Sequence, residues 1–256
     1  MGLFQLIWSF AKAFLGLRKA MRGIDRARAT MQDPMMAAFI RGDYATAKSL
    51  AHDPFFQALI AMQLGHIDEA EQRLRALAQS VDQPQPGALI QSVLGEVLLE
   101  QKRFDEAMEC FQAALRLWPE RGTTYRQIAE MWLRRGDNSQ EALRWARLAL
   151  EKEKGGPGLS EDSKSICLGE DLATLAWAVA VHTHDATEVD RLCDEVSMPA
   201  ITPASTRAQT GYQFGKAWAA LGDPAKSAMY FQHAADLDPN GLWGRAAAAL
   251  AAPSHA

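Results

Sequence analysis

Few residues of this chain have the side-chain types and the spacing that catalysis or metal binding requires. The main gathering of possible metal ligands comprises His182, His184, Asp185, Asp190 and Cys193. Zinc is bound by histidine nitrogen, cysteine sulfur and carboxylate oxygen, and a helix end would bring His182 and Asp185 to one side. His184, however, falls at an expected turn, where polar residues are common in any case. We therefore predict no metal site and keep a regulatory or metal-binding module as a minor alternative.

Two further patterns have ordinary structural explanations. The glycine cluster at residues 155–158 lacks the lysine and the preceding strand of a phosphate-binding loop, and is typical of a linker. Paired carboxylates lie early in expected helices or on their outer faces, where they favour the positive helix N-terminus: Asp68-Glu69, Asp105-Glu106 and Asp194-Glu195. No serine or cysteine nucleophile is placed to meet a histidine. The sequence predicts a protein that is not an enzyme and uses no cofactor.

Composition and charge narrow the class of protein. The 256 residues are 48% hydrophobic and 23% charged, which is ordinary for a soluble globular protein. Residues 1–30 hold six of the 27 basic side chains and one of the 31 acidic ones, so they carry +5 and the remainder carries −9. An acidic body argues against a nucleic-acid partner. The three cysteines, Cys110, Cys167 and Cys193, do not support a disulfide framework, which favours a reducing, cytoplasmic location.

Residues 1–30 have the pattern of a basic amphipathic helix with a wide apolar side. Lys12 interrupts the apolar run and no positive charge precedes it, so we expect neither a signal peptide nor a spanning helix. Lipid, a partner or the protein's own repeats could each cover the apolar side. The side chains expected to contact a membrane surface or a partner are Phe4, Ile7, Trp8, Phe10, Lys12, Phe14, Arg18, Lys19 and Arg22.

The elements that position side chains are clearest in residues 86–119. Small residues at Gly95 and Ala107 allow two helices to cross closely, Leu98 and Phe111 fill the space around them, and Pro119 ends the second helix. These spacings fit a 34-residue helix-turn-helix unit. The stretch resembles a tetratricopeptide repeat, and one such unit needs stacked neighbours to bury its apolar faces.

Turn motifs such as Gly42-Asp43, Gly65-His66, Gly136-Asp137 and Gly222-Asp223 extend the pattern along the chain. We predict an all-α, right-handed superhelix (solenoid) of about six units over residues 33–250, with an N-terminal amphipathic helix and a capping helix and tail at 241–256. The polar stretch 151–168 is expected to be a flexible insertion. The expected units span residues 33–53, 54–80, 86–119, 120–152, 169–197 and 203–240.

The resemblance implies a concave surface lined by the first helix of each unit. The residues expected to face it, and so to bind a partner, are Met36, Phe39, Phe55, Leu59, Met62, Ser92, Glu96, Leu99, Arg126, Glu130, Arg134, Tyr212 and Lys216. The apolar start suits an amphipathic helix laid lengthwise, or is core packed by the N-terminal helix. Arg126 and Arg134 could receive an acidic side chain.

The resemblance also implies a general function. Some tetratricopeptide proteins clamp the two carboxylates of a chaperone C-terminus, but Ser92, Glu96, Arg126 and Glu130 lack the asparagines of that clamp, so this activity is not transferred. We expect a non-catalytic adaptor or scaffold that holds a peptide, helix or protein. The alternative is a peripheral membrane-anchored assembly factor whose N-terminal helix binds lipid or a membrane protein complex. Self-association is left open.

Overall fold

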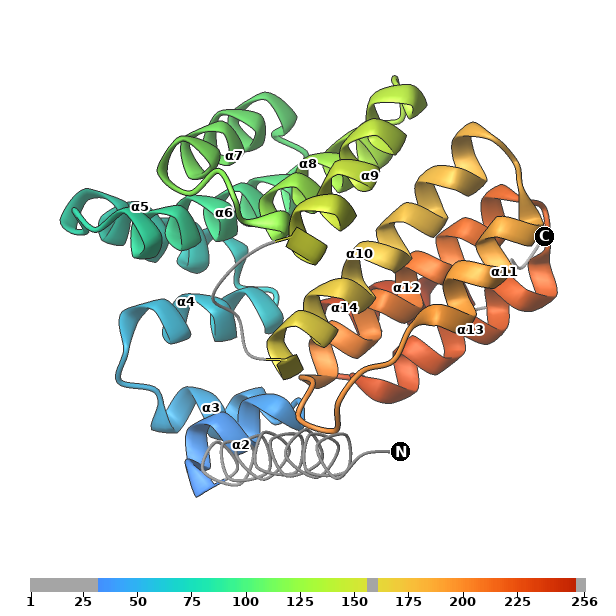
Figure 1. Ribbon diagram of the computed structural model, residues 1–256. Coiled ribbons are helices and arrows are strands. Elements are labelled where there is room, and N and C mark those ends of the chain that lie inside the picture. Colours follow the sequence, from blue (N-terminus) through green and yellow to red (C-terminus); the bar gives the residue numbers. More distant parts are fainter. Residues whose placement is uncertain (1–31, 156–160, 252–256) are drawn as a thin grey trace, which may run out of the picture.

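A computed structural model of the chain describes residues 32–155 and 161–251. These residues form thirteen helices and no strand, arranged as a succession of antiparallel hairpins (Figure 1). The predicted all-α solenoid is therefore confirmed. The expected amphipathic helix at residues 1–30 and the tail beyond residue 251 lie outside the described residues.

Six helical hairpins are followed by a single last helix. Their bounds, in chain order, are α2 (Pro34–Ile40), α3 (Tyr44–Leu50), α4 (Pro54–Gln63), α5 (Ile67–Ser80), α6 (Pro84–Glu100), α7 (Phe104–Leu117), α8 (Gly122–Arg135), α9 (Ser139–Gly155), α10 (Glu161–His182), α11 (Ala186–Glu195), α12 (Ala204–Ala220), α13 (Pro224–Leu237) and α14 (Leu242–Ala251). The first hairpin is short because Pro54 begins a new helix soon after α3.

The six hairpin turns share one backbone conformation. Each first helix is followed by a residue in the left-handed region, with φ between 56° and 81°: Gly42, Gly65, Lys102, Gly136, His184 and Gly222. Glycine adopts this conformation without a Cβ clash. In three turns an aspartate comes next and caps the second helix, as Asp223 does by accepting from the Lys226 N–H at 2.9 Å. In the first and sixth hairpins the Gly-Asp pair therefore marks both the end of one helix and the start of the next, whereas after Gly136 the cap of the second helix is Asn138.

Small residues set the close crossing of the helices within a hairpin. A Cβ built on Gly95 would lie 2.4 Å from the Phe111 ring, and one built on Gly215 would lie 2.5 Å from the Phe231 ring. In the last hairpin Ser227 replaces the expected alanine, and its hydroxyl donates to the Gly215 carbonyl at 3.1 Å. The same crossing thus recurs in the third and sixth units, which is what the spacing predicts.

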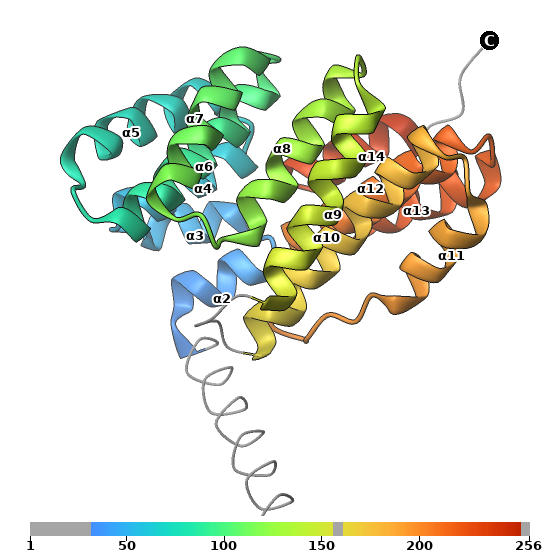
Figure 2. The same cartoon turned by 45° about the horizontal axis from the view of Figure 1, so that its top comes forward.

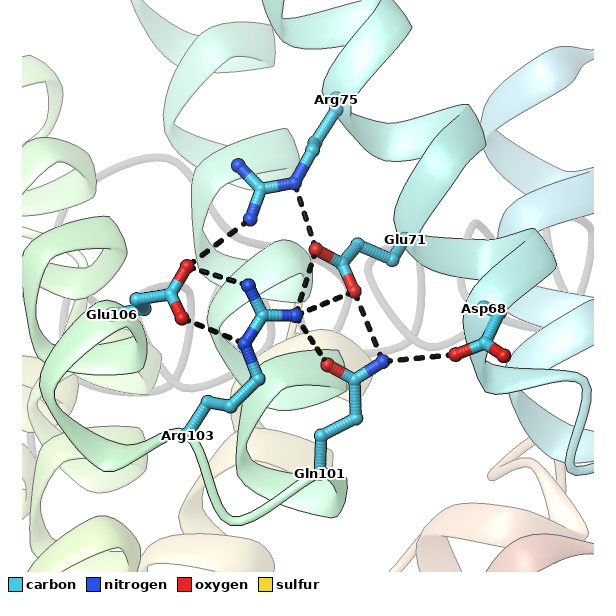
Figure 3. Close-up of polar contacts among 6 residues, drawn as sticks. All are labelled: Asp68, Glu71, Arg75, Gln101, Arg103 and Glu106. Carbon is cyan, nitrogen blue, oxygen red and sulfur yellow. Dashed lines mark hydrogen bonds and ion pairs between the residues drawn. The ribbon is translucent and has the colours of Figure 1, made fainter.

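Adjacent units are also joined by polar contacts about one repeat apart in sequence. On the outer surface, Arg103 donates to Glu71, 32 residues earlier, at 2.8 Å, and to Glu106 at 2.6 Å (Figure 3). Around this pair lie further hydrogen-bonding side chains, and we call the whole set the outer network: Asp68, Glu71, Arg75, Gln101, Arg103 and Glu106. It joins the turn between α6 and α7 to α5.

The interruption expected at residues 151–168 is much shorter in the structure. Residues 151–155 continue α9, and α10 already begins at Glu161. Leu168 packs against the core, and the Ser165 hydroxyl donates to the Ser197 carbonyl at 2.7 Å. Tertiary contacts thus hold the described part of this polar stretch in a helix, and residues 156–160 lie outside the described residues.

Helix α10 runs through the middle of the C-terminal half (Figures 1 and 2). All of its residues from 169 to 180 are buried, since α8 and α9 pack on one side and α11 and α12 on the other. A helix that is buried all round does not show the one-sided pattern of a surface helix. The first helix of the fifth unit consequently lacks a one-sided apolar pattern over this stretch.

The two ends of the solenoid contact each other. The Tyr44 hydroxyl of α3 donates to the Asp238 carboxylate, 194 residues later, at 2.9 Å. The Leu242 N–H at the start of α14 donates to the Gln63 side chain of α4 at 3.3 Å. Helix α14 packs on α12 and α13 as a cap would, but its first turn also reaches the N-terminal units. The concave side is consequently enclosed by both ends of the chain.

Candidate binding cavity on the concave side

The concave side holds a cavity of about 170 Å³, which we call the concave cavity. Seven of the residues expected from the sequence to face the concave side line it: Phe39, Leu59, Met62, Glu96, Leu99, Glu130 and Arg134. They come from α2, α4, α6 and α8, the first helices of four successive units. The repeat phase alone therefore identified most of one wall of the cavity.

The opposite wall comes from the C-terminal end of the chain and was missed at the sequence level. It consists of Pro203, Ser205, Thr206, Gln209, Leu242 and Trp243. Leu242 and Trp243 were expected to belong to a capping helix. The available signal was that Leu242 and Trp243 are two of the few large residues in a helix that is half alanine.

Other expected concave residues lie outside the cavity. Ser92 is fully buried between α6 and α8, where its hydroxyl contacts Thr124 and donates to the Gln127 side chain. Tyr212 packs its ring 5.2 Å from that of Trp243, and the Lys216 ammonium lies 5.6 Å from the Trp177 ring. Met36 and Phe55 are partly buried and do not line the cavity.

Glu130 is the centre of the charged wall. One carboxylate oxygen accepts from Arg134 at 2.7–2.9 Å, and the other accepts from the side-chain amides of Gln209 and Gln213, each at 3.2 Å. Because these amides belong to α12, Glu130 joins the two walls.

Arg134 is fully engaged at the edge of the cavity. It donates to Glu100 at 2.7 Å in addition to Glu130, and its guanidinium lies 4.9 Å from the Trp243 ring centre. Burial opposes its charge, but the two carboxylates raise the pKa of Arg134 above its usual range. The expectation that Arg134 could receive an acidic side chain from a partner is therefore not supported by its surroundings, since two carboxylates already occupy it.

Arg126 lies behind the cavity rather than on its surface, with 3% of its area exposed. It is within 3.6–3.8 Å of three carboxylates, those of Glu130, Glu170 and Asp171. It therefore does not form an exposed receptor for an acidic group either. One buried guanidinium serves three carboxylates at distances longer than a good hydrogen bond.

Burial and neighbouring acids both affect the pKa of the carboxylates around Arg126. Burial raises the pKa of Glu96, Glu170 and Asp171, and Arg126 opposes the rise. Neighbouring acids add to it, because like charges favour the neutral form. The result is a buried region with a clear excess of acid.

The metal-ligand types noted in the sequence serve other purposes in the structure. His182 Nδ1 lies 3.0 Å from the Ser139 hydroxyl, Asp185 caps α11, and Asp190 pairs with Lys226 at 2.8 Å. No group of three possible ligands meets within residues 32–155 and 161–251. Burial also raises the pKa of Cys110 to about 11 and of Cys167 to about 12, so both thiols are protonated at neutral pH.

The residues expected to form the membrane or partner arm, from Phe4 to Arg22, all lie outside the described residues. Among the described helices, none combines the length and the apolar character needed to cross a membrane.

Comparisons with known proteins agree with the fold. Residues 57–122, from α4 to the start of α8, match the family model of the tetratricopeptide repeat. The crystal structure of BtubC (BKLC) from P. vanneervenii superposes with a TM-score of 0.50 at 18% identity, covering 92% of this chain and 94% of that one. A search of curated proteins found no significant match. Residues 57–122 are thus similar to tetratricopeptide repeats, and the described residues form successive helical hairpins.

Proposed function

We propose that this protein is a non-catalytic adaptor that binds a partner protein or peptide at the concave cavity. Tetratricopeptide repeats generally mediate protein–protein interaction. The observation that carries the proposal is the convergence of seven concave residues, chosen from the repeat phase alone, on one cavity. Apolar side chains form one part of its wall and charged side chains the other, as in many recognition sites.

The size of the cavity limits how a partner binds. The lengthwise helix expected from the sequence would compete with Trp243 and the start of α14, which already occupy that side. Ligand pockets for small molecules are usually about 300–1,000 Å³, and this cavity is about 170 Å³. A partner that inserts one or two side chains from its surface fits better than a whole helix or a cofactor.

Capture experiments with the full-length chain test this function. Leu59→Trp fills the cavity from its apolar wall, so we expect it to abolish capture of partners that the unmodified chain retains. Leu50→Trp is the matched control, because Leu50 lies on the outside of α3 with 39% of its area exposed. Equal capture by both variants would contradict binding at the cavity.

A second candidate function rests on residues 1–30, whose sequence combines a wide apolar side with a charge of +5. Such a segment suits a peripheral anchor with its basic side toward anionic lipid. The full chain should then sediment with phosphatidylserine-containing vesicles and less with phosphatidylcholine alone, and Lys19→Glu with Arg22→Glu should release it. Equal sedimentation with both vesicle types would count against an anchor of this kind.

A further inference from the structure

The concave cavity carries more acid than its own bases neutralise. Four glutamates line it, Glu96, Glu100, Glu130 and Glu170, whereas Arg134 is the lining cation in the described part of the chain. Behind the wall, Asp171 adds a fifth carboxylate and Arg126 a second guanidinium.

The hydrogen bonds and ion pairs show which lining carboxylates have a cationic partner and which do not. Arg134 satisfies Glu100 and Glu130, each at 2.7 Å. Within the described part of the chain, Glu96 accepts from a neutral amide alone, that of Gln127, at 2.7 Å. Glu170 is 9% exposed and accepts no hydrogen bond at its carboxylate from any described residue, and its nearest cation is the shared Arg126 at 3.6 Å. Among the described residues, Glu96 and Glu170 therefore have no close cation that is not shared. Arg126 acts on both, and Arg121 acts on both from beyond ion-pair distance.

The rest of the cavity suits the stem of a long basic side chain. Leu59, Met62 and Leu99 form an apolar wall in the same cavity as these two carboxylates. Lysine and arginine side chains bury their methylene groups along apolar surfaces while the charged head meets polar partners. A guanidinium or ammonium group placed here would supply the charge that Glu96 and Glu170 lack.

We propose that the concave cavity is a receptor for the cationic side chain of an arginine or lysine on a partner protein, with Glu96 and Glu170 as the groups that bind its charge. This inference rests on the proposed adaptor function and names the chemistry of the partner. Glu100 and Glu130 are held by Arg134 and shape the site, and the apolar wall receives the methylene stem.

The proposal is tested with small probes on the full-length protein. N-acetyl-arginine amide and N-acetyl-lysine amide carry the proposed charge, whereas N-acetyl-citrulline amide has the shape of the arginine probe without the charge. Binding is followed by the indole N–H resonance of Trp243, assigned with a Trp243→Phe variant. We expect at least one cationic probe to bind about tenfold more tightly than the citrulline probe. Equal affinity for all three, or no shift of the Trp243 resonance up to the solubility limit, would overturn the proposal.

Variants identify the responsible carboxylates. Glu170→Gln and Glu96→Gln should each reduce the affinity for the cationic probe toward that of the citrulline probe, whereas Glu151→Gln, at an exposed position on α9, should not. Thermal unfolding of each variant separates lost binding from lost folding. If the cationic probe binds Glu170→Gln and Glu96→Gln as tightly as the unmodified protein, the assignment of these residues is wrong.

The adaptor function and its cationic partner can fail separately. If Leu59→Trp abolishes capture of a partner while Glu170→Gln with Glu96→Gln leaves it intact, the cavity binds partners but not through a cation. If Leu59→Trp has no effect on capture, the proposed function itself is wrong.

Discussion

Two arginine–glutamate networks join neighbouring units of this solenoid, and they differ in exposure and in charge balance. In the outer network, Arg75 and Arg103 pair with Glu71 and Glu106 at 2.6–3.4 Å near solvent (Figure 3). Around the concave cavity, Arg126 is buried and shared among three carboxylates at 3.6–3.8 Å. In the outer network each arginine has a close glutamate partner, whereas around the concave cavity the carboxylates outnumber the arginines.

This difference separates two uses of the same residue types. Exposed ion pairs are screened by water and add little to stability, so the outer network aligns neighbouring units at small energetic gain. Buried charges without good partners are unfavourable for folding. A region that keeps such charges beside a cavity is better explained by binding than by stability, which is why we propose the binding site there.

The largest effect should come from Arg126→Met. The substitution removes the nearest cation of the buried Glu170 and Asp171 carboxylates, whereas Glu130 keeps Arg134. Breaking a buried pair in this way costs about 3–5 kcal/mol. Urea unfolding at neutral pH measures the loss in the free energy of unfolding. A loss below about 1 kcal/mol would mean that the inner network behaves like an exposed one and would remove the contrast.

Tyr44→Phe should have the next largest effect, because it breaks one of the two hydrogen bonds that join the ends of the solenoid. The buried Asp238 carboxylate would lose the hydroxyl that donates to it at 2.9 Å, and leaving a buried acceptor unpaired costs about 1–3 kcal/mol. Hydrogen exchange should accelerate in α14 and remain unchanged in α5 to α7, which carry the outer network. Uniform acceleration would show that closure of the ends does not specifically support the cavity.

Glu170→Gln should stabilise the protein at neutral pH by about 1 kcal/mol, since it removes a buried charge that lacks a hydrogen bond. Burial raises the pKa of Glu170 in the folded protein. Its contribution to stability is therefore present below the unfolded-state pKa and is lost as pH rises through the folded-state pKa. The advantage of the variant should grow as pH rises from about 4 to 7, as followed by urea unfolding at each pH.

Glu71→Gln should change the free energy of unfolding in the opposite direction in the same urea experiment. Burial opposes the charge of Glu71, but hydrogen bonds from Arg75, Gln101 and Arg103 lower its pKa overall. The stability that ionised Glu71 contributes is present above the unfolded-state pKa and is lost as pH falls through the folded-state pKa. The variant should therefore be less stable than the unmodified protein at neutral pH and converge with it in acid. The same sign for Glu170→Gln and Glu71→Gln would contradict the distinction between the networks.

The smallest effect should come from Arg103→Met in the outer network. Its ion pairs are partly exposed to solvent and so partly screened, and the loss of stability should be much smaller than that for Arg126→Met. It should also vanish in about 1 M salt, at which the screening length is about 3 Å. A loss that is as large as that for Arg126→Met, or that persists in salt, would show that the outer network is more than an aligning contact.

The sequence predicted those features that depend on contacts within a unit or between adjacent ones. Gly95 against Phe111, the left-handed turn residues and the inward phase of Glu130 follow from local spacing, because every unit repeats the same helix crossing. The second wall of the cavity depends instead on how far the superhelix curves before its ends meet. That curvature accumulates from small rotations at each unit, and no short pattern encodes it.

The polar stretch at residues 161–168 was mispredicted for a related reason. Its composition favours a loop, but contacts to the core and to the segment after α11 hold it in a helix. Trp243 likewise has an ordinary sequence environment and gains its place beside Arg134 only through the tertiary fold. Long-range packing decides both cases.

Site-specific photo-crosslinking in the full-length chain tests most directly the claim that partners bind at the concave cavity. A photoreactive phenylalanine analogue would replace Leu59, on the cavity wall, or Leu50, on the exposed outside of α3. We predict a discrete crosslinked partner from position 59, reduced in the Glu170→Gln background, and none from position 50. Crosslinking from position 50 with none from position 59 would contradict the account.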